Sequence, residues 1–263
     1  MSSKSTWVPL RHIRIGGQRV AVASRKELTS ALISDCEISP AERKARLVFD
    51  VNGQGLSLAS TSPEYCEAMK AAHVVHADGG FIVTLSRFLG AGRISERSAT
   101  TDLMEDFSQA AVEHSLTVYL LGGTPDANEM CRSALSNQYP GIKIVGNKHG
   151  YFSTAEETGI VEDISRLNPD LLWVGLGKPK EQQFLARHGD ALRAGWAVTC
   201  GGCFNFVSGS YSRAPKWMQK TNLEWSYRLL KNPRQFFWRY AKTNPHALYL
   251  ALFRTNWRQA PHQ

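Results

Sequence analysis

The sequence predicts an α/β fold of the Rossmann-like type, a parallel sheet flanked by helices, followed by a basic and aromatic helical appendage at the C-terminus. Two observations predict the sheet: short apolar segments alternate with segments of helical periodicity, and polar, glycine-containing loops follow several of the apolar segments. A third observation predicts the appendage, because positive charge and tryptophan gather in the last fifth of the chain.

The predicted strands are short and apolar, as expected for strands that are buried on both faces of a parallel sheet. In chain order they read R-V-A-V-A at residues 19–23, L-V-F-D-V at 47–51, H-V-V-H-A at 73–77, T-V-Y-L-L at 117–121, I-K-I-V at 142–145, L-L-W-V-G-L at 171–176 and W-A-V-T-C at 196–200. Helical periodicity predicts helices near residues 25–35, 62–72, 80–89, 101–114, 125–138, 154–167 and 179–194. The length of 263 residues is compatible with an α/β core at 1–212 and a helical appendage at 213–263.

The appendage carries the excess charge of the chain. Residues 213–258 contain ten Lys and Arg against one acid, Glu224, a net charge of +9, whereas the whole chain has a net charge of +8. Such a segment, interleaved with tryptophans, suits an anionic partner with an apolar side, either a membrane interface or unstacked nucleic acid. A packing role is the alternative, in which Trp217, Trp225 and Tyr227 are core residues of an amphipathic helix.

Other features of the composition argue against several classes of protein. No run approaches the roughly 18 to 20 apolar residues of a membrane-spanning helix, and the start of the chain lacks the apolar core of a signal peptide, so a cytoplasmic protein is expected. Five cysteines, an odd number, argue against a disulfide framework. Cys200 and Cys203 form a C-x-x-C pair that leaves a redox or zinc role open. No second Cys/His pair follows at zinc spacing, which favours core thiols.

Polar residues follow four of the predicted strands. Ligands of open parallel sheets bind beyond the carboxyl ends of strands, so these loops are expected to converge on one site. They read D-V-N-G-Q-G from Asp50, A-D-G-G from Ala77, L-G-G-T-P-D from Leu121 and G-L-G-K-P-K-E-Q from Gly175.

Two of these loops resemble anion sites at helix starts. Backbone N–H groups at Gly122 and Gly123 precede a helix with Pro125 in its first turn and would be free to bind a phosphate, unless this is a plain strand-to-helix turn. Lys178 and Lys180 flank a proline at another helix start, where they either offer charge to a diphosphate or are solvated surface groups.

Asp78 ends a buried strand and is followed by two glycines that let a ligand approach the backbone. A carboxylate in this position can accept the proton of an attacking hydroxyl. Its alternative role is to cap the helix that begins near Phe81. Arg97 precedes a helix that Thr101 or Asp102 would cap, and taken alone it is a surface group.

Several widespread motifs are missing from the sequence. It contains no Asp-x-Asp pair, no Walker G-x-x-x-x-G-K-[ST] and no complete G-x-G-x-x-G. These absences argue against metal-bound nucleotide sugars, P-loop hydrolysis and ordinary dinucleotide binding, so neither a metal nor a cofactor is expected.

Eight segments taken together resemble the WecG/TagA/CpsF glycosyltransferases of bacterial cell-surface polysaccharide synthesis. They keep the family's order over about residues 47–240 and read A-D-G-G-F-I-V from 77, E-R-S-A-T-T-D-L-M from 96, Y-L-L-G-G-T-P from 119, Y-P-G-I-K-I-V-G with H-G-Y-F at 139–152, N-P-D-L-L-W-V-G-L-G-K-P-K from 168, G-G-C-F-N-F-V-S-G from 201, R-A-P-K-W-M from 213 and L-E-W-S-Y-R-L-L-K-N-P-R from 223. The resemblance implies an inverting, metal-independent transfer of a sugar from a UDP-linked donor to a lipid diphosphate-linked acceptor at the cytoplasmic face of the membrane.

The same resemblance implies roles for particular residues. Asp78 falls on the family's proposed catalytic base and Arg97 on an arginine implicated in activity, while Asn52 falls on an asparagine of the same pocket. Arginines of the appendage are thought to close over the donor diphosphate. The loops and the resemblance together predict substrate binding by Asp50, Asn52, Gly79, Gly122, Gly123, Gly177, Lys180, Glu181, Gln182, Asn205, Arg213, Arg228 and Arg234.

The chain departs from the family pattern at three places. Asp50 stands where the family usually has threonine, the usual P-K-Q-E ends in Glu181 and Gln182 with acid and amide exchanged, and the aspartate of the G-G-x-F-D stretch is Asn205. All are expected to face the sugar. The donor therefore need not be of the N-acetylmannosamine type, and a glucose-like donor for an exopolysaccharide repeat unit is the alternative.

The expected partners are a UDP-sugar donor, a polyprenyl diphosphate-linked acceptor and an anionic membrane surface, without nucleic acid. The rival function from another class is a basic nucleic-acid-binding protein, which steep salt dependence of RNA or DNA binding would favour. A nucleotide-dependent oxidoreductase is a third reading, which nicotinamide-induced absorbance changes would favour. The sequence leaves self-association into a homo-oligomer open.

Overall fold

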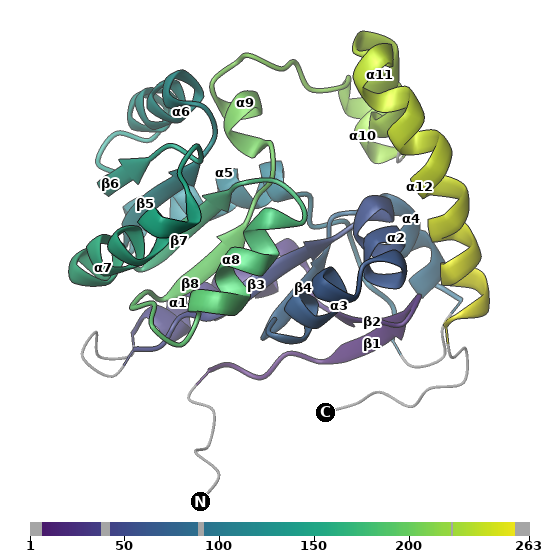
Figure 1. The fold of residues 1–263 in the computed structure, drawn as a ribbon, viewed down its shortest axis with the longest axis horizontal. Coiled ribbons are helices and arrows are strands. Elements are labelled where there is room, and N and C mark those ends of the chain that lie inside the picture. Colours follow the sequence, from purple (N-terminus) through teal and green to yellow (C-terminus); the bar gives the residue numbers. More distant parts are fainter. Residues whose placement is uncertain (1–6, 38–42, 89–91, 222, 256–263) are drawn as a thin grey trace, which may run out of the picture.

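The computed structural model describes residues 7–37, 43–88, 92–221 and 223–255 (Figure 1). Trp257 and Arg258, which contribute to the basic and aromatic pattern of the appendage, lie outside the described residues.

A six-stranded parallel sheet forms the centre of the core. Its strands lie in the order β4-β3-β8-β7-β5-β6, and every neighbouring pair is parallel. This arrangement confirms the predicted Rossmann-like α/β class. The strands are β3 (Arg46–Val51), β4 (Val74–Ala77), β5 (Thr117–Gly122), β6 (Lys143–Lys148), β7 (Leu171–Gly175) and β8 (Trp196–Thr199).

Helices cover both faces of the sheet (Figure 1). One apolar cluster joins one face to α2 (Gly53–Thr61), α3 (Pro63–Lys70), α4 (Gly80–Ser86), α7 (Glu157–Leu167, after the 3₁₀ turn Thr154–Glu156) and α8 (Lys180–His188). A second cluster joins the other face to α1 (Arg25–Cys36), α5 (Thr100–Glu113), α6 (Pro125–Gln138) and α9 (Cys203–Val207). The side chains of β3, β4, β7 and β8 are all buried, which explains why their sequences are apolar almost throughout.

The structure corrects two predictions about secondary structure. The segment predicted as strand 19–23 belongs to a separate antiparallel hairpin, in which β2 (Gln18–Ala21) pairs with β1 (His12–Ile15). Gly16 and Gly17 both have positive φ, as a two-residue hairpin turn requires, so this strand cannot continue the parallel pattern. Helix α2 was not predicted, because its first turn contains two glycines; the side chain of Asn52 caps it by accepting the N–H of Gly55 at 3.1 Å.

The appendage is helical, as predicted, and consists of α10 (Lys216–Lys220), α11 (Glu224–Lys231) and α12 (Pro233–Phe253). The C-terminal half of α12 packs on α2 through the buried Ala247 and Ala251 (Figure 1). Trp217 and Trp225 are exposed and Tyr227 is half-buried, so the alternative in which these three are core residues is wrong for the two tryptophans. Trp238 is exposed as well. Within the described residues, no helix combines the length and the apolar character that crossing a bilayer requires.

Candidate active site

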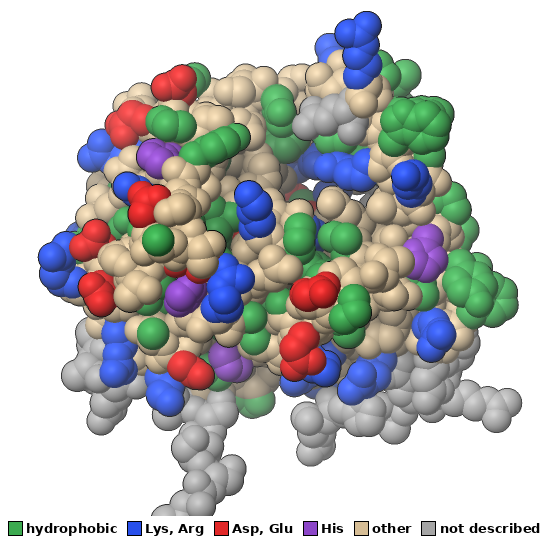
Figure 2. Space-filling view, viewed as in Figure 1, with side chains coloured by type: hydrophobic (Ala, Val, Ile, Leu, Met, Phe, Trp, Pro, Cys, Tyr) green, Lys and Arg blue, Asp and Glu red, His purple; other side chains and the backbone are tan. Residues whose placement is uncertain are grey.

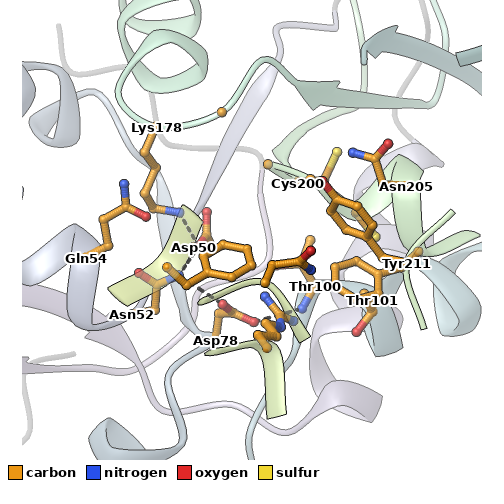
Figure 3. Close-up of a pocket in the computed structure, with 18 of the residues that line it drawn as sticks. Asp50, Asn52, Gln54, Asp78, Thr100, Thr101, Lys178, Cys200, Asn205 and Tyr211 are labelled. Atoms are coloured by element: carbon orange, nitrogen blue, oxygen red, sulfur yellow. Dashed lines mark hydrogen bonds and ion pairs between the residues drawn. The ribbon is translucent and has the colours of Figure 1, made fainter. Parts of the chain in front are cut away.

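A polar cavity of about 540 Å³ lies beyond the carboxyl ends of β3, β4, β7 and β8 (Figure 3). The core contributes Asp50, Asn52 and Asp78 to its lining. The appendage covers the opposite side with residues of α11 and α12, among them Arg228 and Arg239. The volume is within the usual range of small-molecule sites. Core loops and appendage therefore build this cavity together.

Asp78 follows β4, and its carboxylate is held by three groups. Oδ2 accepts the side-chain amide of Asn52 at 3.1 Å, and Oδ1 accepts the backbone N–H of Thr100 at 3.2 Å. The Arg97 guanidinium lies 3.6 Å from Oδ1, and its Nε donates to the backbone carbonyl of Asp78 at 2.6 Å. Asp78 thus does not cap α4, whose first turn has no side-chain cap; it binds the first N–H of α5, which begins after Ala99.

The charges around Asp78 keep it ionised. Burial by itself would raise the pKa of Asp78, but the Arg97 guanidinium, the hydrogen bond from Asn52 and the charges of Lys178 and Arg228 outweigh burial and hold the pKa well below its usual range. The carboxylate is therefore available as a proton acceptor at neutral pH.

Arg97 and Arg228 share one counter-ion, Glu224. The Glu224 carboxylate accepts Arg97 Nη1 at 2.9 Å and Arg228 Nη2 at 2.6 Å. Glu224 is buried at the start of α11. Because Arg97 also contacts Asp78, a continuous chain of charged groups connects the candidate base to the appendage.

A second charged group ties the strand ends together. Lys178 forms an ion pair with Asp50, and Asp50 Oδ1 also accepts the hydroxyl of Thr199 at 3.0 Å (Figure 3). The Asn52 amide lies 3.4 Å from the same carboxylate. Burial alone would lower the pKa of Lys178, but Asp50 raises it, so the ammonium stays charged. Asp50 and Lys178 thus present one acceptor group and one donor group to the cavity.

Glu181 lies next to this pair and is buried completely. Its Oε2 accepts the backbone N–H groups of Gly177 at 3.0 Å and Gly201 at 2.9 Å, which joins the loops after β7 and β8. Burial raises the pKa of Glu181 to about 7; Lys178 opposes the rise and Asp50 adds to it.

The structure brings most of the predicted site residues together. Those that line the polar cavity are Asp50, Asn52, Asp78, Gly177, Glu181, Asn205 and Arg228. Gly79 and Arg97 line an adjoining cavity that also contains Asp78. Gly79 has a packing reason as well, since a Cβ there would lie 3.0 Å from the Asn52 Cα.

Six predicted residues do not line these cavities: Gly122, Gly123, Lys180, Gln182, Arg213 and Arg234. The two glycines serve packing, because a Cβ on Gly122 would lie 2.2 Å from the Gly175 carbonyl oxygen. The Gly123 N–H is not free, contrary to the sequence-based expectation, since it donates to that carbonyl at 3.0 Å.

The other four have different surroundings. Arg213 donates to Asp102 of α5 at 2.5 Å and so fastens the start of the appendage to the core. Gln182 is buried and donates to Glu181 at 3.2 Å. Lys180 and Arg234 are exposed.

Three contributors to the site were missed by sequence reasoning. Glu224 is visible in the sequence as the single acid of a basic segment, but no role at the site was predicted for it. Arg239 and Thr199 carry no local signal. Arg239 lines both cavities, with its guanidinium 4.4 Å from the Phe236 ring centre and 5.0 Å from that of Tyr240.

Cys200 and Cys203 line the polar cavity as free thiols and are buried. Burial raises the pKa of both well above the ordinary value, which leaves them as inert thiols at neutral pH. This agrees with the prediction of core thiols. In the part of the chain that the structure describes, no three His, Cys, Asp or Glu side chains gather closely enough to hold a metal ion.

The fold and the site define an α/β enzyme class in which carboxylates and several cations face a polar cavity at the strand ends. The chain belongs to the Glycosyl transferase WecG/TagA/CpsF family, whose model matches residues 13–261. This confirms the family that the sequence motifs indicated.

Two relatives illustrate the family. An N-acetylglucosaminyldiphosphoundecaprenol N-acetyl-beta-D-mannosaminyltransferase from Bacillus subtilis (strain 168) is 31% identical over 196 residues, which cover 74% of each chain. A protein of the same name from Staphylococcus aureus (strain MRSA252) is 30% identical over 183 residues, 70% of this chain and 71% of the relative.

Proposed function

We propose that this protein is an inverting glycosyltransferase that moves a sugar from a UDP-sugar to a polyprenyl diphosphate-linked acceptor in exopolysaccharide or cell-wall polymer synthesis. The observation that carries the proposal is the ionised Asp78 carboxylate at the meeting point of two cavities, with Arg97 and Arg228 beside it. The acceptor class rests on the names of the relatives.

Asp78 is the carboxylate of the polar cavity best placed to act as the base. Of the other described carboxylates that line it, Asp50 is paired with Lys178, and Glu181 accepts two backbone N–H groups. In the proposed step the acceptor hydroxyl oxygen attacks the anomeric carbon, its proton passes to Asp78, and the bond from that carbon to the phosphate oxygen breaks with its electron pair leaving on UDP. Such a single displacement inverts the anomeric configuration.

The low pKa of Asp78 has a consequence for catalysis. A carboxylate with a depressed pKa is a weak base, and general-base catalysis is most effective when the pKa lies near the working pH. A diphosphate bound beside Arg228 would offset the positive charge that lowers the pKa of Asp78. Donor binding is therefore expected to raise the basicity of Asp78.

The departing UDP needs positive charge, and the appendage supplies it. Arg228, Lys231 and Arg239 all line the polar cavity. Arginine can hold phosphate oxygens through paired hydrogen bonds, and lysine adds a point charge, so Arg228 and Lys231 are proposed to stabilise the leaving group without a required metal. Figure 2 shows the hollow between the appendage and the core, with Lys and Arg side chains inside it.

The donor sugar is proposed to differ from that of the two relatives. Asp50, Glu181 and Asn205, which depart from the family pattern, all line the polar cavity, whereas the fourth departure, Gln182, does not. A carboxylate–ammonium pair in place of a neutral threonine changes which sugar hydroxyls find a partner. A glucose-like donor is therefore proposed as the alternative to an N-acetylmannosamine-type donor.

The test uses the full-length protein, a panel of UDP-sugars and an N-acetylglucosaminyl diphosphate acceptor. A matching donor at 100 times its Kd should stabilise the protein by about 2.7 kcal/mol, and transfer should invert the anomeric centre and persist in EDTA. Absence of transfer from every UDP-sugar would contradict the function. Retention of the anomeric configuration would contradict the single displacement. Loss of activity in EDTA that Mg²⁺ or Mn²⁺ restores would contradict metal independence.

We further propose that the unit from residue 213 onward attaches the enzyme to the cytoplasmic face of the membrane as well as completing the cavity. Each Lys or Arg near an anionic leaflet contributes about 1 kcal/mol, and the exposed Trp217 and Trp238 suit the headgroup region. Full-length protein should bind anionic vesicles at low salt and detach at high salt. Deletion of residues 213–263 should abolish both vesicle binding and transfer to a water-soluble acceptor. Full activity of the truncated protein on that acceptor would mean that the appendage is only an anchor.

A further inference from the structure

A second cavity of about 330 Å³ adjoins the polar one and is bordered by different chemistry. The two share Asp78, Asn52, Gln54, Arg228 and Arg239 in their linings. Beyond this shared part, the apolar side chains that line the second cavity are Phe81 of α4, Trp225 of α11, and Tyr240 and Leu248 of α12. Asp78 is therefore accessible from a polar side and from an apolar side.

The apolar lining leads from Asp78 toward the exterior. Tyr240, Asn244 and Leu248 line the cavity and are spaced four residues apart, so they follow one face of α12 for about 12 Å. Leu248 is 50% exposed, which places it where the cavity opens. Figure 2 shows hydrophobic side chains along the neighbouring outer surface of the appendage.

Arg239 adds an anion-binding group between the two cavities. Its guanidinium contacts the rings of Phe236 and Tyr240 and donates to the Tyr240 hydroxyl at 3.3 Å, while its Nε is buried without a hydrogen-bond partner. The structure shows no ion pair between Arg239 and a carboxylate among the described residues. A cation with a spare donor at the inner end of an apolar passage suits a ligand that joins a phosphate to a hydrocarbon.

We propose that the second cavity is the subsite for the lipid-linked acceptor, with the diphosphate beside Arg239 and the hydrocarbon chain leaving past Leu248. The proposal rests on the glycosyl transfer proposed above. It places the acceptor hydroxyl and the donor sugar on different sides of Asp78, as a displacement in line with the departing phosphate requires.

The test compares two acceptors in detergent micelles: N-acetylglucosaminyl diphosphate on a long polyprenyl chain and the same sugar diphosphate on a short alkyl chain. Leu248→Asn should raise KM for the long-chain acceptor about five- to tenfold, because a half-exposed leucine loses part of its apolar contact with the chain. KM for the short-chain acceptor, KM for the donor and kcat should stay unchanged.

Two control variants separate the cavity from less specific effects. Met130→Asn, on α6 and 49% exposed, removes a similar apolar surface that lines neither cavity and should change nothing. Tyr249→Asn alters an exposed neighbour of Leu248 that does not line the cavity, and it reports contact with the micelle itself. An equal rise in KM for the Leu248 and Tyr249 variants would overturn the proposal.

The remaining outcomes are also decisive. If the wild-type enzyme transfers sugar but Leu248→Asn leaves KM for the long-chain acceptor unchanged, or raises KM equally for both acceptors, the second cavity does not bind the acceptor chain. The proposed function would then remain intact. A wild-type enzyme that transfers no sugar to either acceptor would overturn both.

Discussion

Replacement of Glu224 by alanine is expected to release α11 from the core. Glu224 is the single acid of residues 213–258, and its side chain is 4% exposed, against 19% for Arg97 and 31% for Arg228. Removing one member of a buried ion pair usually costs about 3–5 kcal/mol, because the remaining charge stays buried without a partner.

The surroundings of the two arginines place the expected cost at the lower end of that range. Arg97 keeps the carbonyl of Asp78 at 2.6 Å and the Asp78 carboxylate at 3.6 Å, and Arg228 keeps the face of the Phe206 ring at 4.7 Å. We therefore expect a loss of about 3 kcal/mol, or roughly 10²-fold in the equilibrium between docked and undocked α11. The C-terminal half of α12 should remain in place, since Ala247 and Ala251 pack on α2 independently of this ion pair.

Amide hydrogen exchange measures this change directly. Residues 224–231 should exchange about 10²-fold faster in Glu224→Ala, with an intermediate rate in Glu224→Gln, which keeps an acceptor oxygen but loses the charge. Asp163→Ala breaks the exposed Arg166–Asp163 pair on α7 and serves as the matched control, with an expected effect within about 0.5 kcal/mol. Unchanged exchange of residues 224–231 in Glu224→Ala would refute the view that this ion pair holds α11 on the core.

Three further predictions concern the core side of the site. Asp78→Asn should lower kcat by about 10²- to 10⁴-fold and leave donor affinity near that of the wild type, because the amide oxygen can still accept the Thr100 N–H but cannot take a proton. Normal turnover in steady-state kinetics would leave Asp78 with a capping role only. Glu181, whose pKa is raised to about 7 in the folded protein, contributes stability that is fully present below its unfolded pKa of 4.5 and is lost as pH rises through about 7, a difference of about 3 kcal/mol. In Glu181→Gln, the free energy of unfolding measured in urea should therefore change less between pH 5 and 7.5 than it does in the wild type. Parallel pH profiles of the two proteins would contradict this. Asp50→Thr should destabilise the protein by about 3 kcal/mol, because Lys178 loses its partner. Adding Lys178→Met should restore most of this loss, as measured by thermal unfolding. If the stability changes of the two single variants simply add in the double variant, the two side chains do not depend on each other.

The sequence by itself determined the elements and their class. Apolar strands, glycine-rich strand ends and the charge of the appendage are local patterns, and local patterns indicate which segments become strands, helices and loops. The eight family motifs also indicated the family, and the resemblance implied that Asp78, Asn52 and Arg97 belong to one site. The antiparallel pairing of Gln18–Ala21 and the helix Gly53–Thr61 were missed because glycines carry opposite meanings in turns and at helix starts.

Only the tertiary structure decided which charges meet. Lys178 and Asp50 are 128 residues apart and Arg97 and Glu224 are 127 apart, and no periodicity connects positions at such separations. The parallel sheet brings the ends of β3, β4, β7 and β8 to one edge, and the docking of α12 on α2 carries the appendage over them. The same docking assigns Arg228 and Arg239 to the cavity while Arg213 binds α5 and Arg234 remains exposed. Arginines that look alike in sequence acquire different roles because burial and the position of a counter-ion are properties of the folded chain.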